Sequence, residues 1–378
     1  MTTRALAHRR GSAADLERRI ADARARTIVL WRGERIGLDA LPERVARLDD
    51  RMAREHAYAL YGDALDALNP LYAERLEAWR SEGDPIARAR EEGTDPVAMS
   101  GSLERFSFNV ETPYYAALRR YLALIGIEQG DATEADLWHI ERGSSWSSWF
   151  GPREVRRALA AVRRAPFEVA DIDGWRAVAA QLRGQPSDAV GGAVVGAAFA
   201  TVVADTGWLT EEIGVAPEEV AALVDFATFV RLMHLRRAHA ELIYELRLHG
   251  TTEAALQRAY YGGIVGHHIG AKVTDAAYLA AIGHPFASVR RLEVALLGAM
   301  VVEVLEERAG PTWWREDAAF GFLERVRAAT SIDDTLAQLG YDAIDWRPVL
   351  RQIRTRLIGE MSGYGGPNIT TRAGTRKV

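Results

Sequence analysis

The sequence predicts an all-α protein. Apolar residues recur at intervals of three and four through most of the 378 residues, which is the spacing that gives an α-helix one buried face. Only the run RTIVLW at 26–31 has the β-branched and aromatic character of a strand, and it is too short to carry a sheet. No internal repeat or low-complexity tract interrupts the helical pattern.

The first helices follow from capping residues and periodicity. Ser12 with Asp15 predicts the capped start of a helix over AADLERRIADARAR. From 41 to 80 the apolar spacing predicts one or two long helices, which either break near Asn69-Pro70 or continue through a kink there. The charged segment 81–96, SEGDPIARAREEGTDP, is punctuated by proline and glycine, so we expect a loop.

The rest of the chain continues the helical pattern. Further helices are predicted at residues 114–127, 152–164, 173–182, 189–204, 217–248, 252–261 and 287–307. Pro217 fits the first turn of the longest of these. A pair of closing helices is expected within 311–340, where Ser331 and Asp334 resemble an N-cap pair.

The domain organisation expected from this pattern is simple. We predict a single large helical domain over 12–361, with sub-lobes 12–165 and 166–361 as an option. A basic N-terminus, 1–11, and a C-terminal tail, 362–378, are expected to be disordered.

Composition excludes several classes of function. The net charge of −5, with basic residues concentrated at the two ends, gives no electrostatic case for a nucleic-acid partner. The absence of cysteine excludes disulfides, thiolate metal sites and thiol nucleophiles. No apolar run is long enough to cross a membrane, and no secretory signal follows MTTRALAHRR. We therefore expect a cytoplasmic protein with neither a membrane nor a nucleic-acid partner.

Four segments carry motifs that stand in one order in a known group of enzymes. They are FSFNVETPYYAALRRYLALIGI with DATEADL at 106–137, HLRRAHAELIYELRLHG at 234–250, YLAAIGHPFASVRRLEVALLGAMVVEVLEERAGPTWW at 278–314, and LAQLGYDAIDWRPVL at 336–350. The second contains a YELxLH core formed by Tyr244, Glu245, Leu246, Leu248 and His249. Together they resemble zinc metallopeptidases of the oligoendopeptidase F and thimet oligopeptidase group, over residues 41–350.

The resemblance implies a multi-helix bowl with a central channel and a zinc ion held by an HExxH helix and a glutamate on a second helix. The chain has no HExxH, and no histidine lies between Val162 and Val195. Val195 stands at the position of the glutamate ligand, and Ala287 in FASV stands where the family has a tyrosine in FYSA. We expect the fold to be kept with the catalytic zinc helix deleted, and we expect no catalytic, cofactor-binding or metal-ligating residue.

Further polar and aromatic residues could have either a functional or a structural role. His234, Glu241 and Glu245 share roughly one helix face, but the Glu-x-x-His pairs of helical di-metal sites are absent, so we interpret them as structural. The aromatic segment 141–157 is interpreted as packing. Trp313 and Trp314 are expected in the core, with a role as interface anchors as the alternative. If the former channel persists, its candidate polar lining is Tyr244, His267, His268, His284, Arg290 and Arg291.

Three hypotheses of function follow. The first is a catalytically inactive, metallopeptidase-like accessory or scaffold subunit that binds or stabilises a partner protein, such as an enzyme of the same pathway. The second is a repurposed, metal-free enzyme that acts on a small metabolite in the former channel. The third is a protein that binds peptides without cleaving them.

Overall fold

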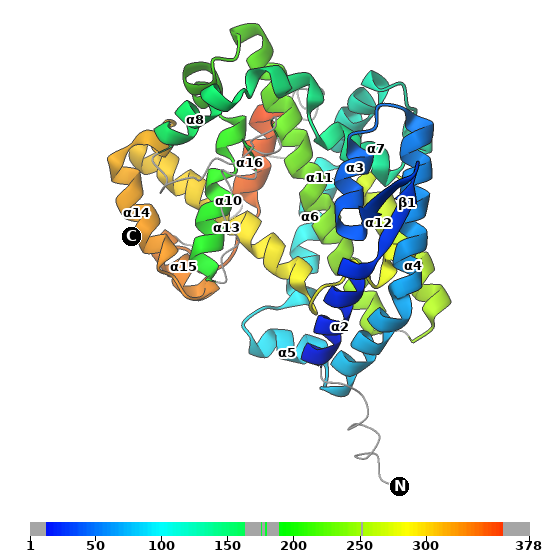
Figure 1. The fold of residues 1–378 in the computed structure, drawn as a ribbon. Helices are drawn as coiled ribbons and strands as arrows, with labels where there is room; N and C mark the ends of the chain where they lie inside the picture. Colours follow the sequence, from blue (N-terminus) through cyan, green and yellow to red (C-terminus); the bar gives the residue numbers. More distant parts are fainter. Residues whose placement is uncertain (1–12, 163–174, 176–177, 180–188, 251, 358–378) are drawn as a thin grey trace. The chain divides into compact units, whose positions relative to one another are not determined.

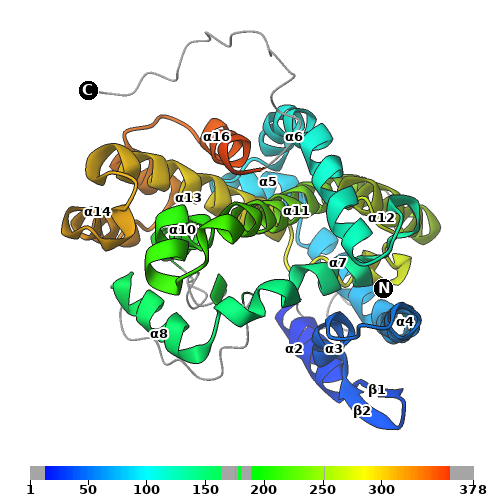
Figure 2. The ribbon, with the colours of Figure 1, turned by 90° about the horizontal axis from the view of Figure 1, so that it is seen from above.

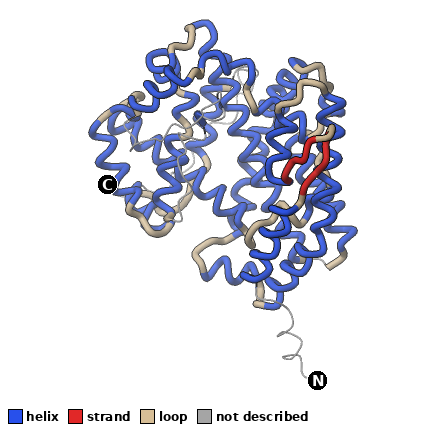
Figure 3. The backbone as a smooth tube through the Cα atoms, viewed as in Figure 1, coloured by secondary structure: helices blue, strands red, loops and turns tan. Residues whose placement is uncertain are grey.

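The computed structural model of the chain is mostly helical, which confirms the all-α prediction (Figures 1 and 3). The structure describes residues 13–162, 175, 178–179, 189–250 and 252–357. Two compact units divide the chain: unit 1 comprises 1–101, 121–141 and 236–289, and unit 2 comprises 102–120, 142–235 and 290–378. The units interleave along the chain, whereas sub-lobes separated at 165 would be contiguous.

Three long helices contribute residues to both units. They are α6 (Pro96–Leu124), α11 (Pro217–His249) and α13 (Ala287–Ala309). The helix predicted at 217–248 is therefore confirmed almost residue for residue, and that predicted at 287–307 extends by two residues. Both predictions rested on long periodic segments, which are the most dependable signal in a sequence.

Unit 1 contains a small hairpin and a set of helices. Its further elements are α2 (Ala13–Arg26), β1 (Ile28–Trp31), β2 (Glu34–Gly37), a 3-10 turn (Leu38–Ala40), α3 (Leu41–Ala46), α4 (Arg51–Ser81), α5 (Pro85–Glu91), α7 (Glu134–Glu141), α12 (Ala254–Ile269) and a 3-10 turn (Asp275–Tyr278). Helix α4 packs against α2, α3 and α7. A hydrophobic cluster that includes Trp31, Leu41 and Val45 joins the hairpin to these helices.

The predicted strand at 26–31 is confirmed as β1, and it pairs antiparallel with β2. A two-residue turn joins the strands, in which Arg32 and Gly33 have φ angles of 50° and 83°. Positive φ at both positions is the geometry that matches the twist of a tight hairpin. The second strand, ERIG, has no strand signal of its own, so the pairing comes from the turn.

Helix α4 settles the alternatives left open at Asn69-Pro70, because it continues through Pro70 as one helix of 31 residues. Proline removes one helical hydrogen bond at this point. Asn69 is buried, and its side-chain amide donates to Asp66 and to the carbonyl oxygen of Ala276 at 2.9 and 3.0 Å. These contacts hold the chain in place where the helix loses its own bond.

The loop prediction for 81–96 is wrong in part, because the segment is two short connections on either side of a helix. Helix α5 occupies residues 85–91 of it, and α6 begins at its end rather than at 114. Asp84 accepts a hydrogen bond from the backbone of Ile86, and Asp95 accepts from Val97 and Ala98. In each case the aspartate is the N-cap and the following proline is the first helical residue. The two Asp-Pro pairs that suggested a loop are helix starts.

Helix α12 is also longer than the predicted 252–261, because it runs through three glycines and ends at Gly270. Gly270 has a φ of 70°, which is the left-handed conformation that commonly ends a helix. An added Cβ at Gly262 or Gly263 would meet no atom within 4 Å. The glycines therefore weaken this helix without breaking it.

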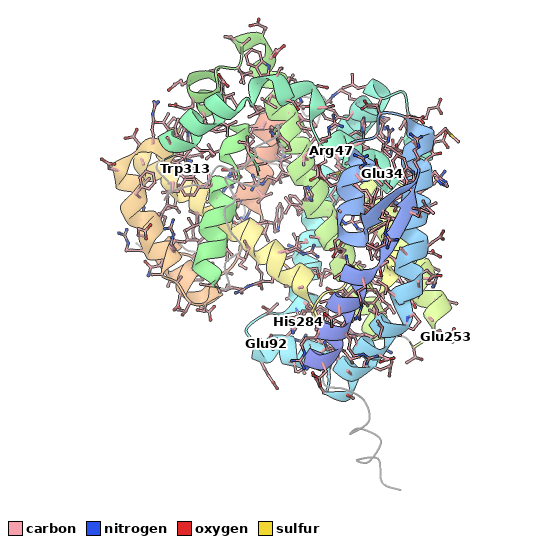
Figure 4. All side chains as sticks on the ribbon, viewed as in Figure 1. Glu34, Arg47, Glu92, Glu253, His284 and Trp313 are labelled. Atoms are coloured by element: carbon pink, nitrogen blue, oxygen red, sulfur yellow. The ribbon has the colours of Figure 1, made fainter. Side chains whose placement is uncertain are left out.

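Unit 2 is also built from helices. Its further elements are a 3-10 turn (Ser144–Trp149), α8 (Pro152–Ala161), α10 (Val190–Phe199), a 3-10 turn (Val202–Ala204), a π-helical turn (Trp208–Ile213), a 3-10 turn (Trp313–Arg315), α14 (Asp317–Arg327), α15 (Ile332–Leu339) and α16 (Arg347–Arg356). The predicted cap of α15 is confirmed, since Ser331 accepts from the backbone of Asp334 at 3.0 Å. Trp313, labelled in Figure 4, and Trp314 are buried, as expected for core residues.

Some predictions concern residues that the structure does not describe. The predicted helix 173–182 lies mostly outside the described residues, as do the expected tails 1–11 and 362–378. Within the part that the structure describes, no helix has the length and apolar character needed to cross a bilayer.

Candidate functional site

The predicted position of the lost zinc ligand lies in α10 of unit 2, where the side chain of Val195 is fully buried. The helix packs against α14 and α15. No Cβ fits at Gly191 because main-chain oxygens at the end of α14 fill the space, and an added Cβ at Gly298 of α13 would lie 2.7 Å from that of Ala197. The glycine and alanine content of this run allows close packing between helices, in surroundings where an ionised carboxylate would lose its hydration.

The histidines and acidic residues do not assemble into an evident metal centre in the described parts of the chain. No group of three or more of these side chains is placed to hold a metal ion among the residues that the structure describes. His234 is exposed and belongs to unit 2, whereas Glu241 and Glu245 are buried and belong to unit 1.

The six residues predicted to line a channel have different surroundings. Tyr244 is buried in α11, and His267 and His268 lie in the last turn of α12. His284, labelled in Figure 4, is exposed, and its ring lies 6.3 Å from that of Trp79. Arg290 and Arg291 belong to unit 2, and the other four belong to unit 1. A shared channel lining stays a prediction.

Two of these residues contact buried partners that no sequence motif indicated. The ring of Tyr244 lies edge-on to Tyr261 of α12 at 5.2 Å, and that of His268 lies edge-on to His239 at 5.7 Å. The hydroxyl groups of Tyr244 and Tyr261 are buried without a hydrogen-bond partner among the described residues. Burial raises the pKa of both phenols, so both remain protonated donors.

A hydrogen-bonded network of polar side chains crosses the interior of unit 1. Tyr58 of α4 donates to Glu134 of α7 at 2.6 Å and accepts from the backbone of Thr274 at 2.8 Å. Arg237 of α11 forms ion pairs with Glu134 and, at 3.0 Å, with Glu241. Both glutamates are buried. The network thus joins four segments that are far apart in sequence.

The charged groups of this hydrogen-bonded network shift one another's pKa values. Burial lowers the pKa of Arg237, but Glu134, Tyr261 and Glu241 together hold it well above its ordinary value. Burial, and then the carboxylate of Glu134, raises the pKa of Tyr61 to about 12. Because each carboxylate is held by the guanidinium, neither is free to act as a general base. The arrangement suits a structural role.

A second buried ion pair supports the same interpretation. Arg54 of α4 and Asp136 of α7 lie 3.0 Å apart, with side chains 2% and 0% exposed. Arg54 also donates to the carbonyl oxygens of Leu48 and Asp49, and Asp136 accepts from the backbone and hydroxyl of Thr133. No sequence signal pairs these two residues, because 82 positions separate them.

The hairpin formed by β1 and β2 (Figure 2) also leaves main-chain groups of β1 without a described partner. Leu38 donates to the carbonyl of Thr27, so hydrogen-bonded pairs alternate along the hairpin at Val29–Ile36 and Trp31–Glu34. The N–H and C=O groups of Ile28 and Leu30 therefore point away from β2. No hydrogen bond from any described residue reaches them.

The side chains of the same two residues are also exposed. Ile28 is 43% and Leu30 is 67% exposed, whereas Val29 and Trp31 face the core. Arg26 precedes the strand and Arg32 follows it, and both are exposed. We call Ile28 and Leu30, with their outward main-chain groups and the two flanking arginines, the hairpin edge. It combines unpaired strand groups, apolar surface and positive charge.

Comparison with known proteins adds no family assignment. No protein-family model matches the chain, and a search of curated proteins gives no significant match.

Proposed function

We propose that the chain is a catalytically inactive, metallopeptidase-like accessory protein that binds a partner protein, and that the hairpin edge is its docking surface. The observation that carries the proposal is the coincidence of exposed side chains and unpaired main-chain groups at Ile28 and Leu30. An open strand edge accepts an extended segment of another chain as an additional strand. The close packing of α10 around Val195 supports the loss of peptidase chemistry.

The charges favour a particular occupant. Arg26 and Arg32 flank the strand, so each end of an added strand would lie beside one arginine. Arg32 has a single described ion pair, with Asp50 at 3.9 Å, and both side chains are more than 60% exposed. Such a pair contributes little by itself. The occupant is therefore an extended segment with apolar side chains in its centre and acidic residues at its ends.

A second copy of the same strand fits less well. If two β1 strands paired antiparallel with Ile28 opposite Leu30, Arg26 of each copy would stand opposite Arg32 of the other. Like charges directly opposite each other destabilise a strand pair. Two such oppositions disfavour self-association through this edge.

The test is a cross-linking experiment followed by a binding measurement. A photo-cross-linking amino acid replaces Leu30 in the full chain, and the cross-linked segment is sequenced after irradiation in the producing cells. The proposal requires an extended segment with acidic flanks. That segment is then synthesised, and its affinity for the purified chain is measured by fluorescence anisotropy.

Two substitutions at one position separate main-chain pairing from apolar contact. Leu30→Pro removes an N–H that points outward and takes no part in the β1–β2 ladder, so the hairpin keeps its hydrogen bonds. Leu30→Thr keeps that N–H and shortens the side chain. We expect Leu30→Pro to weaken binding at least tenfold more than Leu30→Thr. Equal effects, or cross-links only to other copies of the chain, would overturn the proposal.

A further inference from the structure

Two tyrosine hydroxyl groups in the interior of unit 1 are buried side by side. Tyr244 of α11 is 1% exposed and Tyr261 of α12 is 0% exposed. The oxygen atom of each phenol is buried, and neither forms a hydrogen bond with any described residue. Such a hydroxyl costs free energy, because its hydration is lost without compensation. Two of them in contact indicate a place where a polar group from outside the chain is bound.

The two rings meet where α11 packs against α12. Their centroids are 5.2 Å apart and their planes are inclined by 74°, so the edge of one ring faces the other. Burial, and then the phenol of Tyr261, raises the pKa of Tyr244, so the two hydroxyl groups are within electrostatic reach of each other. Both phenols stay protonated at neutral pH, and each can donate one hydrogen bond.

The nearby carboxylates are held by other donors. Glu134 and Glu241 both raise the pKa of Tyr261, which places them close to its hydroxyl. Both form ion pairs with Arg237, and Glu134 also accepts from Tyr58 at 2.6 Å. The hydroxyl of Tyr58 accepts in addition from the backbone of Thr274, so this phenol is satisfied within the fold. The phenols of Tyr244 and Tyr261 have no such partners among the described residues.

We propose that unit 1 binds a small neutral carbonyl compound, such as an amide, between the hydroxyl groups of Tyr244 and Tyr261. A carbonyl oxygen has two lone pairs, so it can accept a hydrogen bond from each phenol. Leu248 and Val265 follow the two tyrosines by four residues on the same helix faces and are fully buried, so they provide apolar surroundings for the rest of the molecule.

The charges around the two phenols favour a neutral ligand. An anion would be repelled by the carboxylates of Glu134 and Glu241, which lie close to Tyr261. A cation offers no lone pair to the two O–H donors, and burying any charge without a partner is costly. The site lies in the helical interior and is independent of the hairpin edge, so either proposal can fail without the other.

The experiment uses trifluoroacetamide as the probe and fluorine NMR of the probe as the measurement, in a titration with the full chain. We expect a saturable change in the probe signal. Tyr244→Phe and Tyr261→Phe each keep the ring and remove one donor, so each should weaken the affinity about fivefold, the loss expected for one neutral hydrogen bond. Without the probe, neither variant should melt below the unmodified chain, because the lost hydroxyl has no described protein partner.

Tyr260→Phe is the matched control. Tyr260 is the neighbour of Tyr261 in α12, but it is partly exposed, and its ring lies 5.3 Å from the guanidinium carbon of Arg247. This variant should bind the probe as the unmodified chain does. A probe signal that does not saturate, or equal affinity in all three variants, would overturn the proposal. Lower melting temperatures of Tyr244→Phe and Tyr261→Phe without any probe binding would also overturn it, since buried water would then hold the hydroxyl groups.

Discussion

Replacing Gly191 by alanine tests whether the uncharged segment 189–204 is a tightly packed helix. An added Cβ would overlap the carbonyl oxygen of Val326 and would lie 2.8 and 2.9 Å from those of Arg327 and Ala329. These are main-chain atoms at the end of α14, so they cannot move aside as a side chain could. The backbone N–H of Gly191 also donates to Ala329 at 3.1 Å, and a displaced helix would lose this bond.

The size of the effect follows from these contacts. Overpacking a core costs about 1–3 kcal/mol when side chains can adjust, and rigid carbonyls place Gly191→Ala at the upper end. The lost hydrogen bond adds about 1 kcal/mol. We therefore expect the free energy of unfolding to fall by about 3–4 kcal/mol.

Gly321→Ala is the matched control in the same unit. Gly321 is exposed in α14, and an added Cβ would meet no atom within 4 Å. Alanine is a better helix former than glycine, so this variant should gain roughly 0.5–1 kcal/mol.

Urea unfolding followed by tryptophan fluorescence measures both variants. The chain has ten tryptophans, and the ring of Trp313 lies 5.4 Å from that of Phe199 at the end of α10, so this region contributes to the signal of global unfolding. If Gly191→Ala stayed within 1 kcal/mol of the unmodified chain, α10 would not pack as closely as the structure shows, and the explanation of its glycines would fail.

The remaining predictions concern the lost site, the buried pair and the response to pH. Val195→Glu should lower the free energy of unfolding by at least about 3 kcal/mol in urea titrations at pH 7, since the ionised carboxylate would enter an apolar interior; a neutral effect would place position 195 beside water or a cation. Arg54→Ala should cost about 3–5 kcal/mol, measured in the same way, because it strands the carboxylate of Asp136; the double variant with Asp136→Ala should recover part of the loss, and strictly additive losses would argue against coupling. Burial lowers the pKa of His249 to about 4, below its unfolded value near 6.5, so its neutral form stabilises the fold above pH 6.5 and this contribution is lost as the pH falls toward 4. His249→Gln should therefore flatten the pH dependence of unfolding between pH 4 and 6.5 by about 2 kcal/mol, and an unchanged slope would show that the imidazole is already charged in the fold. Purified protein should not cleave a fluorogenic oligopeptide, and cleavage abolished by a chelator would refute the proposed loss of zinc chemistry.

Much of the secondary structure follows from signals that lie within a few residues of one another. The apolar spacing of 217–248 predicted α11, and the Ser331 cap predicted the start of α15. Such signals depend on local backbone geometry and on one buried face, both of which can be read from a short window. The errors at 81–96 were also local, because each Asp-Pro pair was interpreted as a turn although it satisfies the requirements of an N-cap and first turn.

The candidate sites depended on the tertiary structure. The hairpin edge needs the register of β1 with β2, since a shift by one residue would turn Ile28 and Leu30 toward the core. Tertiary structure also brings Arg231 of α11 beside Gln352 of α16, which is 121 positions away.

By itself, the sequence determined that the chain is helical, where most helices lie, and that no HExxH motif is present. Only the tertiary structure decided which charges neutralise one another, as for Arg54 with Asp136, and which main-chain groups stay unpaired, as at Leu30. The reason is physical. Helix formation is governed by neighbours three and four residues apart, whereas burial and pairing of charges are governed by distance in space between segments that the sequence separates widely.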